Sequence, residues 1–420
     1  MSLLLSGLGT RRSSRGAAGL FLLFLSGCVH TPPAAMGARG GAPSATKSPL
    51  SEAELRTTDG EIAVANLQAQ IEGEEKLGAY RPLTVGQRAG IASLVAMRGQ
   101  FLGRIADYER AAEIAEALVL EMPTDPESFL ARAQVRASLH RFAAALLDLD
   151  EAERLGLRGG RLDSMRAAIF EATGRYDEAL AIRLPMARTR PDIRSLGALA
   201  SLRAARGEVE EAERLFAEAP LHYRDVSPFP VAWLYFQQGS MWMREGKEER
   251  ARELFAASER RLPAYAKARG HLAEVEAALG RTDRALELLR PLARSSDDPD
   301  YAAQLARILG DAAQPEEAAS WRAVAATRYD DLMGRHPEAF ADHAAEFWLA
   351  AGGDPRRALN LAQTNLAVRP TPRAYELVMN AALAVGDKKA ACDAGSSASA
   401  LPHPWPSLRS LTEQALAGCG

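Results

Sequence analysis

The sequence predicts an all-α protein built from a row of similar helical hairpins, and three observations support this prediction. The 420-residue chain contains 82 alanines and only 6% aromatic residues, a composition that favours helix over sheet. Its length exceeds what one compact core supports, so several domains or an extended array is expected. A short sequence motif, which consists of a turn residue, a spacer and an alanine, also recurs about every 34 residues. Such a period is the signature of a repeat architecture.

The overall composition narrows the class of protein further. With 47% apolar and 25% charged residues, the chain has the balance of a folded soluble protein rather than a disordered one. Its 51 basic and 54 acidic side chains give a net charge of -3. This near-neutral net charge does not indicate that the protein binds nucleic acid.

Residues 1–27 form a predicted export signal. Arg11, Arg12 and Arg15 precede a short apolar run that ends at Leu25, as in a secretory signal peptide. The run is too short to span a bilayer. The segment from Leu25 to Cys28 reads Leu-Ser-Gly-Cys and resembles the lipobox of bacterial lipoproteins. The alternatives are an ordinary signal peptide with an unmodified cysteine, or an uncleaved anchor.

The lipobox resemblance implies that Cys28 carries the lipid and becomes the first residue of the mature chain. Because Val29 rather than aspartate follows it, the resemblance implies the outer membrane of a Gram-negative bacterium, with the periplasmic face as the expected location. Residues 28–50 are rich in Pro, Ala, Gly and Ser and are expected to form a flexible tether. Without the signal the chain has 48 basic and 54 acidic residues, net -6.

Residues 91–400 contain about nine repeats. An alanine opens the second helix of each predicted hairpin, and the spacings between these anchor alanines are 34, 34, 33, 39, 34, 33, 40 and 33. The anchors are Ala111, Ala145, Ala179, Ala212, Ala251, Ala285, Ala318, Ala358 and Ala391. The clearest copy runs from Gly174 through Tyr176 to Ala179.

This pattern resembles the tetratricopeptide repeat family. Small residues such as Ala133 and Ala167 match the family's first-helix position, Tyr176 matches its turn aromatic, and Pro370 matches its closing proline. The resemblance implies an α-solenoid, a right-handed superhelix of helix-turn-helix repeats. A single hairpin cannot bury its apolar face, so neighbouring hairpins must stack.

The two long spacings have separate origins in the sequence. The spacing of 39 contains a proline-bearing insert, His222 to Pro230, and the spacing of 40 contains a longer second helix that runs through Tyr329 to His336. Insertions in solenoids map to loops on one face, often where partners bind.

Helical caps are expected at both ends of the array. Residues 51–90 contain an amphipathic stretch from Glu61 to Leu77, and residues 401–420 contain a predicted capping helix. Cys392 and Cys419 lie 27 residues apart. In an oxidising compartment such a pair suggests a disulfide that fastens the capping helix. The alternative is two unpaired thiols.

No sequence pattern indicates an active site or cofactor. The chain lacks a hydrolase elbow, a Walker loop, an HExxH motif and a CxxC motif. The group that most resembles a metal site is His336, His343 and Glu346. His336, however, lies one helical turn too far from the other two side chains to bind the same metal ion easily. A zinc site needs three or four converging ligands, so we expect no metal and no cofactor, and a solvated or partner-contacting face instead.

Aromatic residues mark a candidate binding groove. Applying the helical period to the first helix of the fifth repeat places Trp233, Phe236 and Met243 on its inner face. In the eighth repeat the same face carries Phe340, His343 and Phe347. These side chains either meet a partner or fill gaps around the insert.

The sequence therefore predicts a non-catalytic scaffold or assembly factor of the cell envelope. It would bind a protein or peptide partner, attach to the membrane through its lipid, and act on no evident small-molecule substrate. One alternative is an envelope hydrolase that uses His343 and Glu346. The other is a purely structural spacer.

Overall fold

The fold is all-α, as the sequence predicted, and its helices pack in consecutive antiparallel pairs. The computed structural model describes residues 55–419 and has no β-strand within them. The chain enters through α1 (Gly60–Tyr80) and ends with α20 (Pro406–Ala417). Within the described residues, no helix combines the length and apolar character needed to cross a membrane.

Nine helical hairpins lie between α1 and α20 in the described part of the chain, and we number them as repeats 1 to 9. Their first helices are α2 (Val85–Leu102), α4 (Pro126–Ser138), α6 (Gly160–Ala172), α8 (Ile193–Ala205), α10 (Pro228–Arg244), α12 (Ala266–Ala278), α14 (Pro299–Asp311), α16 (Pro337–Leu349) and α18 (Pro372–Val385). Their second helices are α3 (Ile105–Glu121), α5 (Phe142–Arg154), α7 (Tyr176–Thr189), α9 (Val209–Glu218), α11 (Glu248–Arg261), α13 (Thr282–Ser295), α15 (Pro315–Arg335), α17 (Pro355–Val368) and α19 (Lys388–Ser399). A short 3-10 helix, η1 (Ala219–His222), follows α9.

The anchor alanines explain why each hairpin closes. All nine are 3% exposed or less, because a methyl group lets the paired helices approach closely. The turn before each second helix contains a residue in the left-handed conformation, which is glycine in seven repeats and His140 or Ala313 in the other two. Glycine adopts this conformation at the lowest cost.

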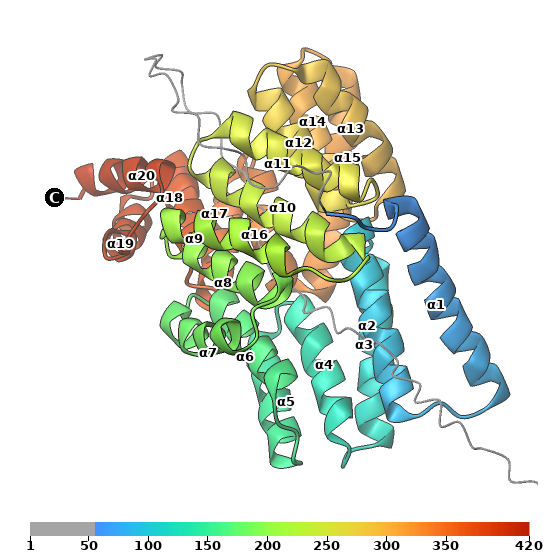
Figure 1. Cartoon of the computed structure of the whole chain (residues 1–420). Coiled ribbons are helices and arrows are strands. Elements are labelled where there is room, and N and C mark those ends of the chain that lie inside the picture. The colour runs from blue at the N-terminus through green and yellow to red at the C-terminus, as the bar shows by residue number, and fades with distance from the viewer. Residues whose placement is uncertain (1–54, 420) are drawn as a thin grey trace, which may run out of the picture.

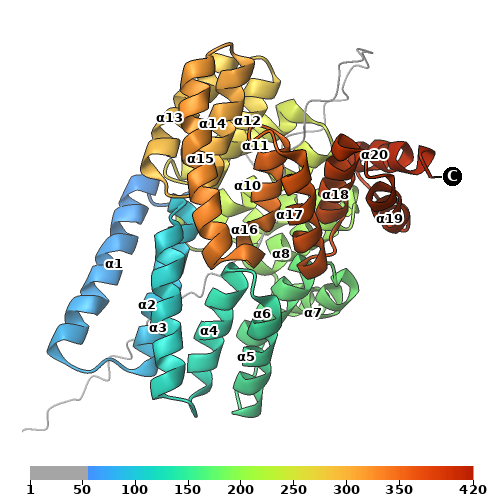
Figure 2. The same cartoon turned by 180° about the vertical axis from the view of Figure 1, so that it is seen from behind.

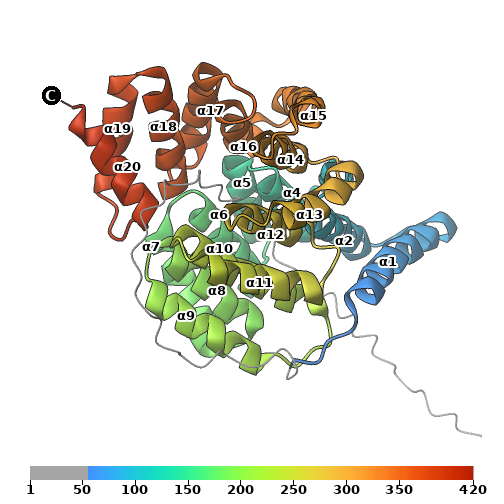
Figure 3. The same cartoon turned by 90° about the horizontal axis from the view of Figure 1, so that it is seen from above.

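The hairpins wind into two stacked layers. Repeats 1–4 (α2–α9) form the first layer, repeats 6–9 (α12–α19) form the second, and repeat 5 connects them. In Figures 1 and 2, α14–α17 lie above α3–α6. Seen from above, the layers overlap, while α1 and the α18–α20 end project to opposite sides (Figure 3).

A regular set of contacts, which we call the interlayer seam, joins the layers. The hairpin turn of each first-layer repeat touches the linker that follows the repeat five positions later. In the first contact, Ser296 donates a hydrogen bond to the carbonyl oxygen of Gly103. The Asp297 carboxylate accepts hydrogen bonds from the backbone N–H groups of Ile105 (2.6 Å) and Ala106 (3.0 Å). Since α3 has no side-chain cap of its own, the second layer caps this helix.

The other three seam contacts repeat this arrangement. His140 Nδ1 lies 3.2 Å from the carbonyl oxygen of Glu338. Arg369 Nε donates to the carbonyl oxygen of Ala172 (3.2 Å). At Gly207, a Cβ would lie within 3.0 Å of the backbone carbonyl oxygen of His403. At three of the four contacts the turn presents a backbone carbonyl or a glycine that the linker can approach, whereas at the second the His140 side chain makes the contact.

Both irregular spacings contribute to closure of the array. Val226, in the insert between repeats 4 and 5, accepts a hydrogen bond at its carbonyl oxygen from Thr58 N (2.7 Å), so the insert holds the segment before α1. The long α15 ends with Arg335, which pairs with Glu109 of α3. His336 Nε2 lies 2.9 Å from the same carboxylate. In the described residues, both the insert and the extended end of α15 therefore make contacts within the molecule.

A disulfide joins Cys392 of α19 to Cys419, which follows α20, with the Cα atoms 5.8 Å apart. It is the pairing that the sequence left open. The bond closes a loop of 27 residues and fastens the C-terminal helix to repeat 9. Trp405 and Leu408, at the start of α20, are buried in one apolar cluster with residues of α18 and α19. Packing and the covalent bond therefore both hold α20 against repeat 9.

We expect Gly174→Ala to destabilise the protein more than Gly280→Ala does. Both glycines have left-handed φ values, +75° and +77°, but only at Gly174 would a Cβ lie within 3.0 Å of the Pro370 carbonyl oxygen. The backbone strain, about 1–2 kcal/mol, is shared by both variants. Denaturant unfolding measures the free energy of unfolding of both variants. An equal loss in the two variants would contradict the close contact at the seam.

Replacing both Cys392 and Cys419 by serine should lower the local stability of α20. The loop-entropy relation for 27 residues gives an upper value of about 3.5 kcal/mol. Hydrogen exchange of α20 amides provides the measurement, with α4 as an internal control. Unchanged exchange in α20 would show that packing alone holds this helix.

Candidate functional site

The aromatic side chains predicted to line a groove are buried in the described structure. Trp233, Phe236 and Met243 are between 2% and 6% exposed. The ring of Phe236 lies 5.4 Å from that of Tyr265, which in turn lies 4.8 Å from Phe101 of α2. The first repeat thus covers the inner face of the fifth and sixth, and the prediction that these residues are open to a partner is wrong.

The second set of predicted groove residues is divided among other contacts. Phe340 is 8% exposed and clusters with Ile105 of α3 and with Leu332. Phe347 is 3% exposed and stacks on Tyr329, with ring centroids 5.3 Å apart. Phe340 thus meets the first layer through Ile105, whereas Phe347 packs among helices of its own layer, and the helical period could not distinguish these two outcomes.

His343 is the sixth predicted groove residue, and it lies in a buried charge cluster. Its Nδ1 is 3.8 Å from the Asp300 carboxylate and its Nε2 is 3.9 Å from that of Asp342. Asp342 also pairs with Arg369 of the seam at 2.9 Å. His343 therefore belongs to the charged groups that support the seam rather than to an exposed face.

These neighbours set the protonation of the cluster. Burial opposes the charge on His343, but the carboxylates of Asp342, Asp300 and Asp298 outweigh it and raise the pKa of His343 to about 9. Burial and the nearby Asp300 raise the pKa of Asp298 to about 6. Burial also disfavours the Asp342 carboxylate, yet His343 and Arg369 hold its pKa below the usual range.

The residues considered for a hydrolase do not converge on one site. Glu346 forms an ion pair with Arg373, whereas His343 contacts Asp300 and Asp342. His336 lies against Glu109 of the first layer. Within residues 55–419, no group of three or more His, Cys, Asp or Glu side chains is placed to hold a metal. Cys28, the predicted lipid attachment site, lies outside the described residues.

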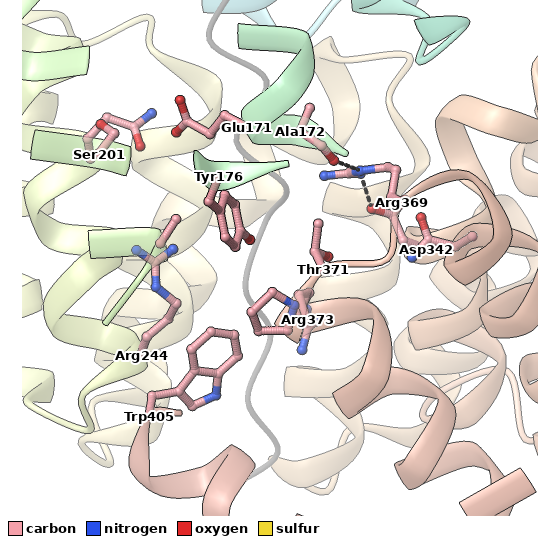
Figure 4. Close-up of a pocket in the computed structure, with 14 residues that line it drawn as sticks. Glu171, Ala172, Tyr176, Ser201, Arg244, Asp342, Arg369, Thr371, Arg373 and Trp405 are labelled. Carbon is pink, nitrogen blue, oxygen red and sulfur yellow. Dashed lines mark hydrogen bonds and ion pairs between the residues drawn. The ribbon is translucent and has the colours of Figure 1, made fainter. Parts of the chain in front are cut away.

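A polar cavity opens at the third seam contact, where repeat 3 meets the linker between repeats 8 and 9. Its volume is about 90 Å³, and both layers contribute to its walls. Figure 4 shows Tyr176 and Arg244 on the side of the first layer and repeat 5, facing Thr371 and Arg373, with Trp405 between the two sides. The lining residues are Glu171, Ala172, Tyr176, Ser201, Ala205, Gln237, Arg244, Asp342, Asn365, Arg369, Thr371, Pro372, Arg373 and Trp405.

Most of the charged groups that line this cavity are paired. Arg369 binds Asp342 at 2.9 Å, Arg373 lies 3.3 Å from Glu376, and Glu171 accepts a 2.8 Å hydrogen bond from Arg183. Arg244 is different, since it has no ion pair or hydrogen bond among the described residues. The cavity therefore presents an unneutralised guanidinium.

Burial shifts the pKa values of the groups in this cavity. It raises the pKa of Glu171, although Arg183 opposes the shift. It also raises the pKa of the Tyr176 hydroxyl, with Glu171 adding to the effect. Burial lowers the pKa of Arg244, while nearby acidic groups act against it. Burial thus opposes the charged form of each of these three groups, and Glu171 is the one whose charge is offset by a direct partner, Arg183.

Sequence reasoning missed this cavity because its residues come from seven separate helices and two linkers. Tyr176 was identified only as a turn aromatic, and Pro370, next to the cavity residues Arg369 and Thr371, only as a closing proline. The two prolines that flank Thr371 are a local signal that this linker is extended. The sequence contains no signal that places it against repeat 3.

We expect stability to fall between about pH 6.5 and pH 9 through His343. A pKa raised from 6.5 to about 9 means that the folded state holds a proton which the unfolded chain releases, so the stabilisation is complete below pH 6.5 and is lost as pH rises through 9. The shift corresponds to roughly 3 kcal/mol. Thermal unfolding across this range should show the decline in the native protein and in a surface control, His222→Gln, but a much smaller one in His343→Gln. A decline of equal size in His343→Gln would contradict the assignment.

Comparison with known proteins supports the repeat assignment. Residues 243–308, from the end of α10 through most of α14, match the family model described as "Tetratricopeptide repeat". No curated protein matches the chain. Among solved structures, a chain of the APC/C hetero-tetramer Cut9-Hcn1 matches with a TM-score of 0.44 and 12% identity, over 80% of this chain and 67% of that chain. The human IFIT1 dimer with PPP-AAAA matches with a TM-score of 0.49 and 16% identity, over 79% of this chain and 76% of that chain.

The family match covers parts of repeats 5 to 7, and the same left-handed turn and buried anchor alanine occur in the other hairpins of the described residues. The described residues form an α-solenoid of helical hairpins, within which residues 243–308 match the tetratricopeptide repeat model.

Proposed function

We propose that this protein is a non-catalytic scaffold that binds a protein partner at the cell envelope, where a lipid on Cys28 tethers it. The observation that carries the scaffold part is the repeat array itself, since tetratricopeptide repeats suggest a protein-interaction role. The tether is supported by the sequence before residue 51. Val29 at the position after the modified cysteine supports the outer membrane, and we propose its periplasmic face as the location of the array.

The outer rim of the first layer is the surface that we propose for the partner. It consists of the α1–α2 loop and the linkers between first-layer repeats, on the opposite side from the seam. The α1–α2 loop and the far ends of α3 and α5 form the lower edge of the molecule in Figures 1 and 2. Tyr80 and Leu120, near this rim, are 88% and 82% exposed, and Met122, Leu221 and Val226 are also exposed apolar residues in linkers.

This distribution favours the first layer over the second as the binding surface. Among the described residues, every large apolar side chain that is strongly exposed lies between Ile62 and Val226. Exposed apolar side chains that gather on one part of a surface mark partner contacts. The seam contacts hold the first layer against the second. We therefore expect the rim to keep one conformation before and after the partner binds, which lowers the entropy cost of binding.

Metabolic labelling with an alkyne fatty acid tests the tether. The native chain should incorporate the label and fractionate with membranes, whereas Cys28→Ser should do neither. Cys392→Ser is the matched control and should keep the label, because this cysteine lies in the folded array. Labelling of Cys28→Ser would overturn the proposed attachment site.

Site-specific photo-crosslinking in cells tests the partner surface. A photoreactive residue at position 80 or 120 should give a discrete adduct with one protein, since these positions lie at the proposed rim. The same residue at Arg284, exposed on α13 of the second layer, is the control and should give none. Equal adducts from position 284, or none from the rim, would count against this surface.

A further inference from the structure

We propose that the polar cavity at the third seam contact binds a carboxylate monoanion, which bridges the two layers through Arg244. This site is separate from the first-layer rim, and the inference does not depend on which partner the rim binds. The cavity lies inside the seam, between repeat 3 with its neighbouring helices and the linker that precedes α18 (Figure 4).

The unneutralised guanidinium is the first step of the argument. Arg244 is the last residue of α10, and its side chain lines the cavity with no hydrogen bond or ion pair among the described residues. Glu171, Glu245 and Glu376 influence it only through longer-range electrostatics. A half-buried guanidinium without a close counter-ion is costly, and a carboxylate offers it a bidentate partner.

Two further polar groups in the cavity are unused. The Tyr176 hydroxyl has no hydrogen bond among the described residues, and its raised pKa keeps it a donor at neutral pH. The side-chain oxygen of Asn365 is buried without a partner in the described structure, and a half-turn of this amide would present its NH₂ group instead. Together with Arg244, these groups supply donors on both sides of one small space.

The charge of the walls selects a monoanion. Arg244, Arg369 and Arg373 line the cavity with Glu171 and Asp342, which gives three positive and two negative groups. A single carboxylate neutralises the surplus charge. A phosphate dianion would face both acidic side chains and exceed the available positive charge.

The volume limits the size of the occupant. At about 90 Å³, the cavity has room for a few water molecules or a short acid, and it is well below the roughly 300–1,000 Å³ of drug-sized ligand sites. The rings of Tyr176 and Trp405 and the Pro372 ring form an apolar part of the wall that suits a short methylene stem. The occupant is therefore a free short carboxylic acid, or an acidic side chain or C-terminus of a peptide.

Binding at this position should stabilise the closed superhelix, because the ligand would contact residues of both layers. A ligand that binds only the folded state raises its stability in proportion to the logarithm of ligand concentration. Thermal unfolding of the mature chain in increasing propionate is the first measurement, with propionamide as the neutral control. We expect propionate to raise the Tm and propionamide to leave it unchanged.

Two variants make the test specific. Arg244→Gln should weaken propionate binding at least about tenfold, because one charge-assisted interaction is lost. Arg214→Gln is the matched control on the exposed face of α9 and should bind as the native chain does. Glu171→Gln keeps Arg244 and removes one of the two carboxyl groups that line the cavity, so it should bind propionate more tightly. This second variant keeps the test valid if Arg244→Gln fails to fold.

Further binding measurements with peptides identify the molecule that supplies the carboxylate. A tripeptide with a free C-terminus that binds at least about tenfold more tightly than propionate, while its C-terminal amide does not bind, would assign a peptide C-terminus. Binding by propionate alone would assign a free acid, and tight binding by a peptide with an internal glutamate would assign an acidic side chain. The proposal is overturned if phosphate matches propionate, if Arg244→Gln folds and responds like the native chain, or if Glu171→Gln binds no more tightly.

Discussion

The interlayer seam is the constraint on which the rest of this structure depends. Four hairpin turns of the first layer each meet a linker of the second, and the offset of five repeats is the same in every case. Three of the contacts use backbone atoms of the turn, which requires turns without bulky side chains, and the fourth uses the His140 side chain. Glycine at Gly103, Gly174 and Gly207 meets this requirement, and the conformation that closes each hairpin therefore also allows the superhelix to close on itself.

Because the two layers close on each other, the inner face of the solenoid is buried between them. In an open array, aromatic residues on first helices would meet solvent or a partner. Here Phe101 of α2 packs against Phe229 and Tyr265, so the chain supplies its own occupant for that space. Residues that suggested recognition instead hold the layers together, and exposed apolar side chains remain on the outer rim of the first layer.

The seam also concentrates charge where the layers meet. Arg369 and Asp342 pair there, His343 stands beside Asp342, and Arg244 faces the neighbouring cavity. Buried charges are stable only when they are paired, and most of these are. Arg244, the guanidinium of the cavity wall that has no ion pair or hydrogen bond in the described structure, lies where the two layers separate enough to leave a cavity. The closure of the array and the candidate binding site therefore arise at the same incompletely filled contact.

The sequence by itself determined the local structure, because helix propensity, turn chemistry and the 34-residue period act over short distances. It predicted the repeat and the alanines that close each hairpin, and it marked the insert and the long α15 as unusual. Only the tertiary structure decided what those features contact. Val226 holds Thr58, Arg335 reaches Glu109, and Arg244 remains without a counter-ion in the described structure. Each of these outcomes depends on how far the superhelix turns per repeat. Small rotations at the eight interfaces between consecutive hairpins add up to that angle, and no single residue pattern encodes the sum.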